Sequence, residues 1–123
     1  MSKILIIEDD KNNRDIYSQV LKEAGYEVDV AEDGEMGMFK LNQGGYSLIL
    51  LDLMLPKVDG LTILSNIKKS PPKLPNGKIV VLSNLSHEPI IQQAKALGAF
   101  EALTKSDIDP EQLVEEVKKV LSS

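Results

Sequence analysis

Short apolar runs alternate with longer amphipathic segments along the whole chain. Three runs are continuously apolar, at residues 4–7, 48–51 and 79–82, as expected of parallel strands that are buried on both faces. Two less apolar runs, at 28–31 and 100–103, predict further strands, and the polar character of the run at 28–31 places it near an edge of the sheet. A segment with helical periodicity follows each run. Five strand-then-helix units predict an α/β domain in which a parallel sheet is covered by helices on both faces.

The helical segments differ in how clearly the sequence marks them. In the last one, Asp109 is expected as the N-cap, Pro110 lies in the first turn and Gln112 is placed to return a hydrogen bond to the cap. The segment at 34–42 is weaker because Gly37 interrupts it. The first segment, 11–24, carries four apolar residues on one stripe that is expected to face the core: Ile16, Val20, Leu21 and Ala24.

Composition narrows the class of protein. The chain has 123 residues, which fits one domain over 1–123, and 42% of them are apolar, which suffices for one core. The net charge of −5 disfavours direct nucleic-acid binding, which needs a basic face. The absence of cysteine excludes disulfides, thiolate metal sites and cysteine nucleophiles. The apolar run after Met1 is too short for export or for crossing a membrane, so a cytoplasmic location without membrane contact is expected.

Polar residues follow four of the predicted strands. In an open α/β sheet, ligands bind beyond the carboxyl ends of the strands, so these residues are candidates for a shared site. The first strand is followed by three acidic residues, the third by one acidic residue, the fourth by a hydroxyl and the fifth by a cation: Glu8, Asp9 and Asp10, then Asp52, Ser83 and Lys105.

Such a set suits phosphoryl transfer. Two carboxylates about 4 Å apart repel each other by about 4 kcal/mol at an effective dielectric constant near 20, so a hard divalent cation is expected among them. Mg²⁺ leaves positions open for a phosphate oxygen, and a carboxylate such as Asp52 can itself be the nucleophile that becomes an aspartyl phosphate. Lys105 would supply a positive charge and Ser83 a hydroxyl donor to the phosphoryl oxygens.

Four segments, in order along the chain, resemble response-regulator receiver domains. They are residues 3–10 (KILIIEDD), 50–60 (LLDLMLPKVDG), 80–84 (VVLSN) and the pair 98–99 with 103–105 (GA and LTK). Within the second segment, Asp52, Pro56 and Gly60 follow one another at four-residue steps. One such motif alone is weak evidence, but four in order are specific, and the likeness spans essentially the whole chain.

The resemblance implies a fold and a site. The fold is doubly wound and flavodoxin-like, with five parallel strands in the order 2-1-3-4-5 between five helices. Asp52 would be the phosphoacceptor, and Ser83 and Lys105 would bind the phosphoryl oxygens. The resemblance implies Mg²⁺ as cofactor, with these ligands: Asp9 as the main one, Asp52, Glu8 directly or through water, and the backbone carbonyl of Met54.

The resemblance also implies partners. The phosphoryl group would come from a sensor histidine kinase or a histidine phosphotransfer protein, and the signal would pass to a downstream protein. Catalysis would be limited to self-phosphorylation and autodephosphorylation, and the chain would be a monomer or a weak homodimer. Phosphorylation would pull Ser83 and Lys105 inward and move the helix at 89–97 by a population shift. Whether the chain acts alone or as part of a larger protein stays open.

Two positions depart from the family pattern. Ala102 stands where an aromatic residue usually lies, three residues before the lysine, so the usual relay between hydroxyl and aromatic side chain lacks its second half. Phe100 is not expected to replace it. Ser106 stands where the family favours proline, so a trans peptide bond is expected there.

Some polar residues have a simpler structural interpretation, and other functions are compatible with the same fold. Asp10 is expected to cap the first helix, and His87 is expected to be a solvent-facing residue rather than a base. The main alternative function is a receiver-like interaction module that works without phosphorylation, against which the complete acidic set argues. An aspartyl-phosphate hydrolase would need a second Asp where Met54 stands, and an FMN carrier would need a hydroxyl-rich loop after the first strand.

Overall fold

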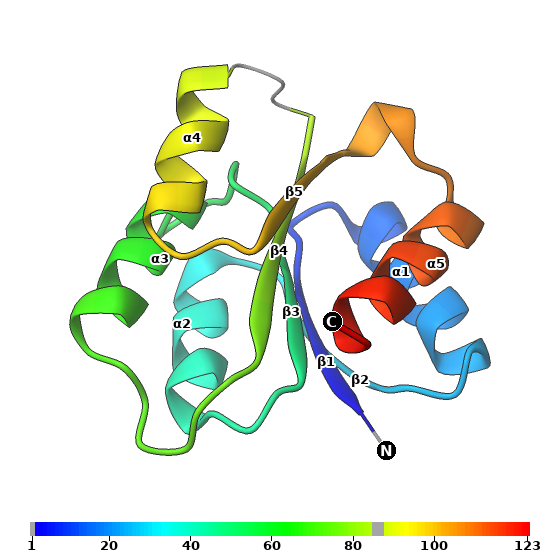
Figure 1. Cartoon of the computed structure of the whole chain (residues 1–123), viewed down its shortest axis with the longest axis horizontal. Helices are drawn as coiled ribbons and strands as arrows, with labels where there is room; N and C mark the ends of the chain where they lie inside the picture. Colours follow the sequence, from blue (N-terminus) through cyan, green and yellow to red (C-terminus); the bar gives the residue numbers. More distant parts are fainter. Residues whose placement is uncertain (1, 85–87) are drawn as a thin grey trace.

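The five predicted strands form one parallel sheet. The structure is a computed structural model and describes residues 2–84 and 88–123. The strand order is β2-β1-β3-β4-β5, and all four neighbouring pairs are parallel (Figure 1). The strands are β1 (Lys3–Ile7), β2 (Glu27–Ala31), β3 (Leu48–Leu51), β4 (Lys78–Ser83) and β5 (Glu101–Thr104). The predicted fold and strand order are confirmed, including the edge position of β2.

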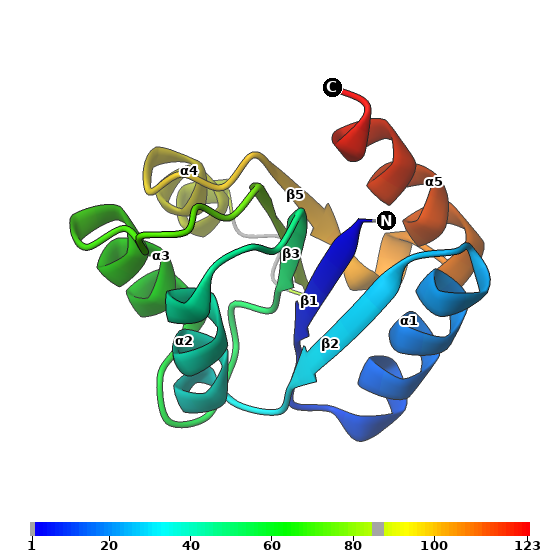
Figure 2. The same ribbon diagram turned by 90° about the horizontal axis from the view of Figure 1, so that it is seen from below.

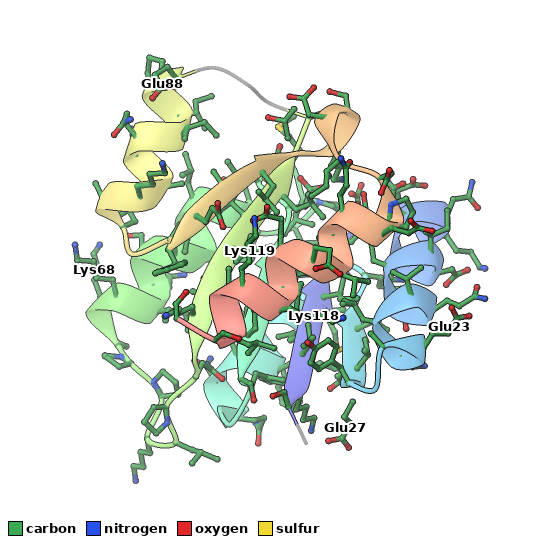
Figure 3. All side chains as sticks on the ribbon, turned by 45° about the vertical axis from the view of Figure 1, so that its right-hand side comes forward. Glu23, Glu27, Lys68, Glu88, Lys118 and Lys119 are labelled. Carbon is green, nitrogen blue, oxygen red and sulfur yellow. The ribbon has the colours of Figure 1, made fainter. Side chains whose placement is uncertain are left out.

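Helices cover both faces of this sheet. They are α1 (Lys11–Glu23), α2 (Gly34–Gln43), α3 (Gly60–Lys69), α4 (Glu88–Ala96) and α5 (Pro110–Leu121), with a 3₁₀ turn at Lys105–Asp107. Figure 2 shows α1 and α5 on one side of the sheet and α2, α3 and α4 on the other. The charged side chains of Lys118 and Lys119 lie on the outer surface of α5 (Figure 3). Within the described residues, no helix is long and apolar enough to cross a membrane.

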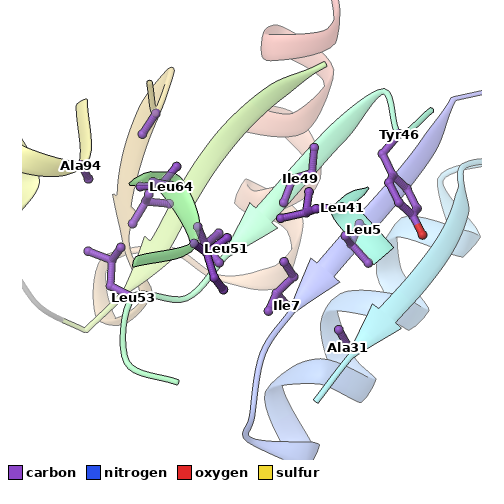
Figure 4. Close-up of a cluster of buried hydrophobic side chains, with 13 residues drawn as sticks. Leu5, Ile7, Ala31, Leu41, Tyr46, Ile49, Leu51, Leu53, Leu64 and Ala94 are labelled. Carbon is purple, nitrogen blue, oxygen red and sulfur yellow. The ribbon is translucent and has the colours of Figure 1, made fainter. Parts of the chain in front are cut away.

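The continuous apolar strands supply two cores at once. Successive residues of a strand point to opposite faces. Leu5 and Ile7 of β1 therefore pack in the cluster under α2, α3 and α4 (Figure 4), whereas Ile4 and Ile6 pack under α1 and α5. All four are at most 1% exposed. Each such side chain contributes about 1.5–3 kcal/mol by leaving water, which explains why residues 4–7 of β1 include no polar side chain.

Two helices bury different residues from those that their patterns indicated. In α1 the buried residues are Tyr17 and Leu21, whereas Ile16 is 44% exposed and Ala24 lies beyond the end of the helix. Leu21 and Val20 pack in the core as predicted, whereas Tyr17 takes the place expected of Ile16, because burying its large ring removes more apolar area from water. Gly37 does not interrupt α2. It is buried where a Cβ atom would lie 2.9 Å from the Ile7 side chain, so it lets α2 pack closely on β1.

The expected signals at the start of α5 are confirmed. The Asp109 carboxylate accepts a hydrogen bond from the Gln112 backbone N–H at 2.8 Å, and the Gln112 side chain accepts one from the Asp109 N–H at 2.8 Å. The cap on α1 is different, since Asp10 is at the N-cap position but its side chain makes no capping hydrogen bond, so that expectation is wrong. The expectation for His87 lies outside the described residues.

Candidate functional site

The carboxyl ends of β1 and β3 bring two acidic residues together. Ile7 and Leu51 are paired in register, so Glu8 and Asp52, which follow them, are neighbours at the same edge of the sheet. The Asp52 backbone N–H donates to the Ile7 carbonyl at 3.0 Å, which continues the sheet by one more hydrogen bond. Both side chains are enclosed, with Glu8 2% and Asp52 5% exposed. Two carboxylates in so little water require a positive charge nearby.

Lys105 supplies that charge. Its Nζ atom lies 2.9 Å from Oδ2 of Asp52 and also forms an ion pair with Oε1 of Glu8, and its side chain is only 9% exposed. Burial alone would lower the pKa of Lys105, but the hydrogen bonds to Glu8 and Asp52 raise it overall, so the ammonium stays charged. Burial, with a smaller contribution from the charge of Asp52, raises the pKa of Glu8 to about 7, although the hydrogen bond from Lys105 acts in the opposite direction.

Asp9 completes an acidic cluster. One carboxylate oxygen from each of Glu8, Asp9 and Asp52 lies within 4.8 Å of the others, and Asp9 is exposed while its two neighbours are buried. Oxygen donors at this spacing suit Mg²⁺, which prefers carboxylates and carbonyls and keeps several water ligands. A hollow of about 530 Å³ adjoins the cluster and is lined by Asp9, Met54 and four further residues: Leu53, Leu55, Pro56 and Asp59. The residues present therefore fit the metal that the sequence predicted.

Asp52 is held by both of its oxygens. Oδ2 faces Lys105, and Oδ1 accepts a hydrogen bond from the Met54 backbone N–H at 3.0 Å. The backbone of Met54 therefore lies directly beside the carboxylate, while its side chain is 63% exposed. The role of the Met54 carbonyl as a metal ligand stays a prediction.

The loop after Asp52 explains the spacing to Gly60. The Gly60 N–H donates to the Leu53 carbonyl at 3.0 Å. A Cβ atom on Gly60 would lie 2.7 Å from the Asp52 carbonyl oxygen and 2.6 Å from the Leu53 Cα, so a larger residue would push the site-bearing backbone away. Asp59 then starts α3 by accepting a hydrogen bond from the Thr62 N–H at 2.9 Å. The distance in sequence from Asp52 to Gly60 thus follows from how tightly the start of α3 is packed against the loop.

Arg14 is a contributor to the site that sequence reasoning missed. Its Nη1 atom donates to the backbone carbonyl of Glu8 at 2.9 Å and to that of Asp9 at 3.3 Å. The guanidinium, on the first turns of α1, therefore fixes the backbone that carries the two acidic side chains. Only its position, one turn after Asp10, could have indicated this, because no local pattern predicts hydrogen bonds to backbone carbonyls.

Ser83 and the two departures from the family pattern lie along β4 and β5. Ser83 is 1% exposed and is paired in register with Thr104, the residue before Lys105. Ala102 pairs with Val81 and packs against the cluster under α2, α3 and α4. Phe100 lies before the amino end of β5, away from the site, where the Lys78 ammonium sits 4.3 Å from its ring centre. Binding of a phosphoryl oxygen by Ser83 stays a prediction. The effect of Ala102 on the usual relay between hydroxyl and aromatic side chain also stays a prediction.

The peptide bond before Ser106 is trans, as expected, since the described residues contain no cis bond. Lys105 begins the 3₁₀ turn at Lys105–Asp107. The cation is therefore presented at the start of this turn, directly after the last residue of β5.

Comparison with known proteins points in one direction. A family model described as the response regulator receiver domain matches residues 4–118. The chain is 32% identical to the chemotaxis protein CheY of Treponema pallidum over 97% of this chain and 82% of that protein. It is 34% identical to the transcriptional regulatory protein DltR of Streptococcus agalactiae over 84% of this chain and 45% of that protein, so it spans less than half of DltR.

A solved structure adds the same likeness in three dimensions. The response regulator protein TrrA of Thermotoga maritima, in complex with Mg²⁺ and BeF, superposes with a TM-score of 0.82 at 35% identity. The match covers 98% of this chain and 99% of that one. The likeness therefore extends over the whole sheet and all the elements that carry the acidic cluster.

Proposed function

The chain belongs to the response regulator receiver domain family, and on that basis we propose that Asp52 accepts a phosphoryl group in a two-component phosphorelay. One observation carries the proposal. The Asp52 carboxylate is buried, lies 2.9 Å from the Lys105 ammonium and shares an edge of the sheet with the carboxylates of Glu8 and Asp9. This combines a nucleophile, a fixed positive charge and a set of oxygen donors for a divalent cation.

Each side chain has a defined part in the proposed transfer. A carboxylate oxygen of Asp52 attacks the phosphorus of a phosphohistidine, the new O–P bond forms as the N–P bond breaks, and the imidazole leaves. The Lys105 ammonium stabilises the charge on the phosphoryl oxygens, and the Ser83 hydroxyl donates to one of them. The hydrogen bond from the Met54 N–H holds the second Asp52 oxygen in place during the attack.

Receiver domains of this family bind Mg²⁺ at acidic residues, and we propose that this chain does so too. Its ligands would be Asp9, Asp52, Glu8 and the Met54 carbonyl. When bound, the ion would neutralise charge on the carboxylates and on the transferred group. Glu8 already shares one oxygen with Lys105, and its other oxygen accepts from the Asp10 N–H at 3.1 Å, which favours contact through water.

The proposed catalysis is limited to the chain's own modification. Water attacks the phosphorus of the aspartyl phosphate, the P–O bond to Asp52 breaks, and inorganic phosphate leaves while the carboxylate is restored. No second substrate is turned over, so we class the chain as a phosphorylated switch rather than as an enzyme. The exposed Met54 at the second position after Asp52 supports this, because it offers no acid or base to speed hydrolysis.

Receiver domains of two-component systems interact with histidine kinases, and we propose a sensor histidine kinase or a histidine phosphotransfer protein as the donor. The signal would pass through protein contacts in the cytoplasm, by a monomer or weak homodimer. Direct binding to nucleic acid is not proposed, given a net charge of −5. Phosphorylation would change signalling through a population shift of α4. Because position 102 is alanine, this shift would be coupled to the site through other side chains than the usual aromatic one.

The proposal is tested by intact mass after treatment with acetyl phosphate. The parent chain should gain one phosphoryl group with Mg²⁺ and little without it, and Asp52→Asn should gain none. Asp107→Asn is the matched control, since Asp107 is exposed and outside the acidic cluster, and it should label like the parent. Equal labelling of Asp52→Asn would refute the assignment and leave the phosphorylation-independent module as the better reading.

A further inference from the structure

Helix α2 carries two exposed apolar side chains on the same face. Phe39 is 64% and Met36 is 43% exposed. Residues three apart on a helix are neighbours on its surface. Among the large exposed apolar residues in the described part of the chain, these are the only two that share a helix face, since the others are scattered: Ile16, Met54, Leu74 and Phe100. Single exposed apolar residues are ordinary, whereas adjacent ones form a contiguous apolar surface, the kind of surface found at interaction sites.

The pair lines a hollow. A space of about 410 Å³ is bounded by Met36, Phe39, Lys57 and three acidic residues, Glu32, Asp33 and Glu35; we call these six residues the α2 patch. Aromatic and methionine side chains beside a concavity are the residues that anchor protein–protein contacts most often. The α2 patch therefore has the shape to receive one apolar side chain of a partner.

The charges of the α2 patch define what could enter it. The Asp33 carboxylate is already engaged, because it accepts from the Met36 N–H at 2.8 Å and lies 3.5 Å from the Lys57 ammonium. Glu32 and Glu35 are exposed and, in the described part of the chain, make no ion pair. The rim of the hollow is thus left with two unbalanced negative charges around an apolar centre.

The α2 patch is continuous with the loop that follows Asp52. The Gly34 N–H donates to the Pro56 carbonyl at 3.1 Å, and a Cβ atom on Gly34 would overlap the Val58 carbonyl oxygen at 1.7 Å. Between them, Lys57 has a left-handed backbone with φ of 71°, which is uncommon for a residue other than glycine. The loop that follows Asp52 therefore supplies one wall of the hollow, through Lys57.

We propose that the α2 patch is a docking site for a segment of another protein that carries one large apolar residue between cationic residues. The apolar residue fills the hollow against Phe39 and Met36, and the cations face Glu32 and Glu35. This proposal goes beyond phosphoryl transfer and does not require it, because all six residues of the α2 patch are in place in the unmodified chain.

Charge argues against two other occupants. A second copy related by a two-fold axis would place the same acidic rim opposite itself, which costs binding energy through like-charge repulsion. A membrane surface rich in anionic lipid would repel Glu32 and Glu35 in the same way. A cationic partner segment is the occupant that the rim attracts.

The test uses three synthetic helical peptides of equal length as probes. The first has one Phe flanked by Lys, the second has Glu in place of Lys, and the third has Ser in place of Phe. The full chain is labelled on its methionine methyl groups, because Met36 lines the α2 patch while Met54 lines the separate hollow beside Asp9. Only the first peptide should move the Met36 methyl signal in a saturable way.

Matched variants locate the binding. Phe39→Ala should weaken binding of the first peptide at least about tenfold, whereas Phe100→Ala, also exposed but outside the patch, should leave it unchanged. The pair Glu32→Gln and Glu35→Gln should weaken it too. The pair Glu111→Gln and Glu115→Gln is the control and should leave binding unchanged. Both residues line another hollow, of about 570 Å³, beside α5 on the opposite face of the sheet (Figure 1).

The remaining outcomes overturn the proposal. Binding that survives Phe39→Ala, or that is lost only with the Glu111 and Glu115 pair, would place the site elsewhere. Equal binding of the acidic peptide would refute the charge argument, as would the absence of binding by all three peptides at millimolar concentration. Movement of the Met36 signal on diluting the free chain would identify a second copy as the occupant. Loss of binding in Phe39→Ala that is matched by an equal loss in Phe100→Ala, with unchanged melting midpoints in both, would likewise show that the α2 patch is not the site.

Discussion

The ammonium of Lys105 lies 2.9 Å from a carboxylate oxygen of Asp52, although the two residues are 53 positions apart in the chain. Asp52 follows β3 and Lys105 follows β5, and only β4 lies between these two strands in the sheet. The same ammonium pairs with Glu8, so one cation balances two buried acids before any phosphoryl group arrives. The cation that would bind phosphate is therefore also part of what keeps the unmodified site folded.

Removing this cation should destabilise the chain. In Lys105→Met, Glu8 and Asp52 remain buried without a cationic partner, so the free energy of unfolding at pH 8 should fall by about 1–3 kcal/mol. Urea denaturation measures the change. Lys118→Met removes an exposed lysine with only a 3.8 Å pair to Glu115 and should change stability by less than about 0.5 kcal/mol. Equal losses in both variants would mean that Lys105 does not balance the buried pair.

Magnesium should stabilise the chain through Asp9. The carboxylates of the acidic cluster repel one another without a cation, so Mg²⁺ binding to the folded state should raise the melting midpoint. At a Mg²⁺ concentration ten times the dissociation constant, the free energy of unfolding should rise by about 1.4 kcal/mol. Differential scanning calorimetry with and without Mg²⁺ measures this. Asp9→Asn should abolish the shift and Asp107→Asn should keep it. An unchanged midpoint in the parent at millimolar Mg²⁺ would argue against a metal site here.

Acid should weaken a second ion pair, at the sheet edge. Burial alone would raise the pKa of Asp29, but hydrogen bonds from Lys40 at 2.7 Å and Tyr46 at 2.8 Å lower it overall. Because the folded pKa is depressed, this stability is present above the unfolded pKa of 3.8 and is lost as pH falls through the folded value. Asp29→Asn should therefore cost about 0.5–1.5 kcal/mol at pH 7.

The pH profile distinguishes this pair from general acid effects. The stability difference between the parent and Asp29→Asn should shrink steadily below pH 4, measured by urea denaturation at each pH. Asp107→Asn, which removes an exposed carboxylate that makes no ion pair with the described residues, serves as the control. A constant difference from pH 7 to pH 2 would show that Asp29 acts through packing rather than through its charge.

Gly60 should tolerate no side chain. A Cβ atom there would press on the Asp52 carbonyl oxygen and the Leu53 Cα, both of which are backbone atoms that cannot turn aside. Gly60→Ala should cost about 1–3 kcal/mol of stability and slow labelling of Asp52 by acetyl phosphate. Asn66→Ala, an exposed change in the same helix, should do neither. Normal labelling kinetics in Gly60→Ala would show that the loop adjusts without disturbing the carboxylate.

Much of the fold could be predicted because strands that are buried on both faces are apolar at every position. Runs such as 48–51 are apolar at every position only when both faces are covered, and this alone indicated a parallel sheet with helices on each side. The burial of Tyr17 instead of Ile16 in α1 could not be predicted in the same way. Ile16 and Tyr17 are adjacent and both able to pack, and the contacts of the assembled sheet decide which one is buried.

The candidate site shows the same division. Its residues could be predicted because they end strands, and the strand order follows from the family resemblance. The shared ion pair of Lys105 with Glu8, the contacts of Arg14 to backbone carbonyls and the steric need for Gly60 depend on distances between segments far apart in the chain. Such distances leave no local pattern, so only the structure reveals them.

The assignment of Asp52 is tested most directly by chemical trapping. The chain is treated with acetyl phosphate and Mg²⁺ and then reduced with borohydride, which converts an aspartyl phosphate to homoserine, and the modified position is read by peptide mass spectrometry. We predict homoserine at position 52 and at no other aspartate. Homoserine at Asp9 or Asp10 instead, or none despite a gain of phosphoryl mass, would contradict the account.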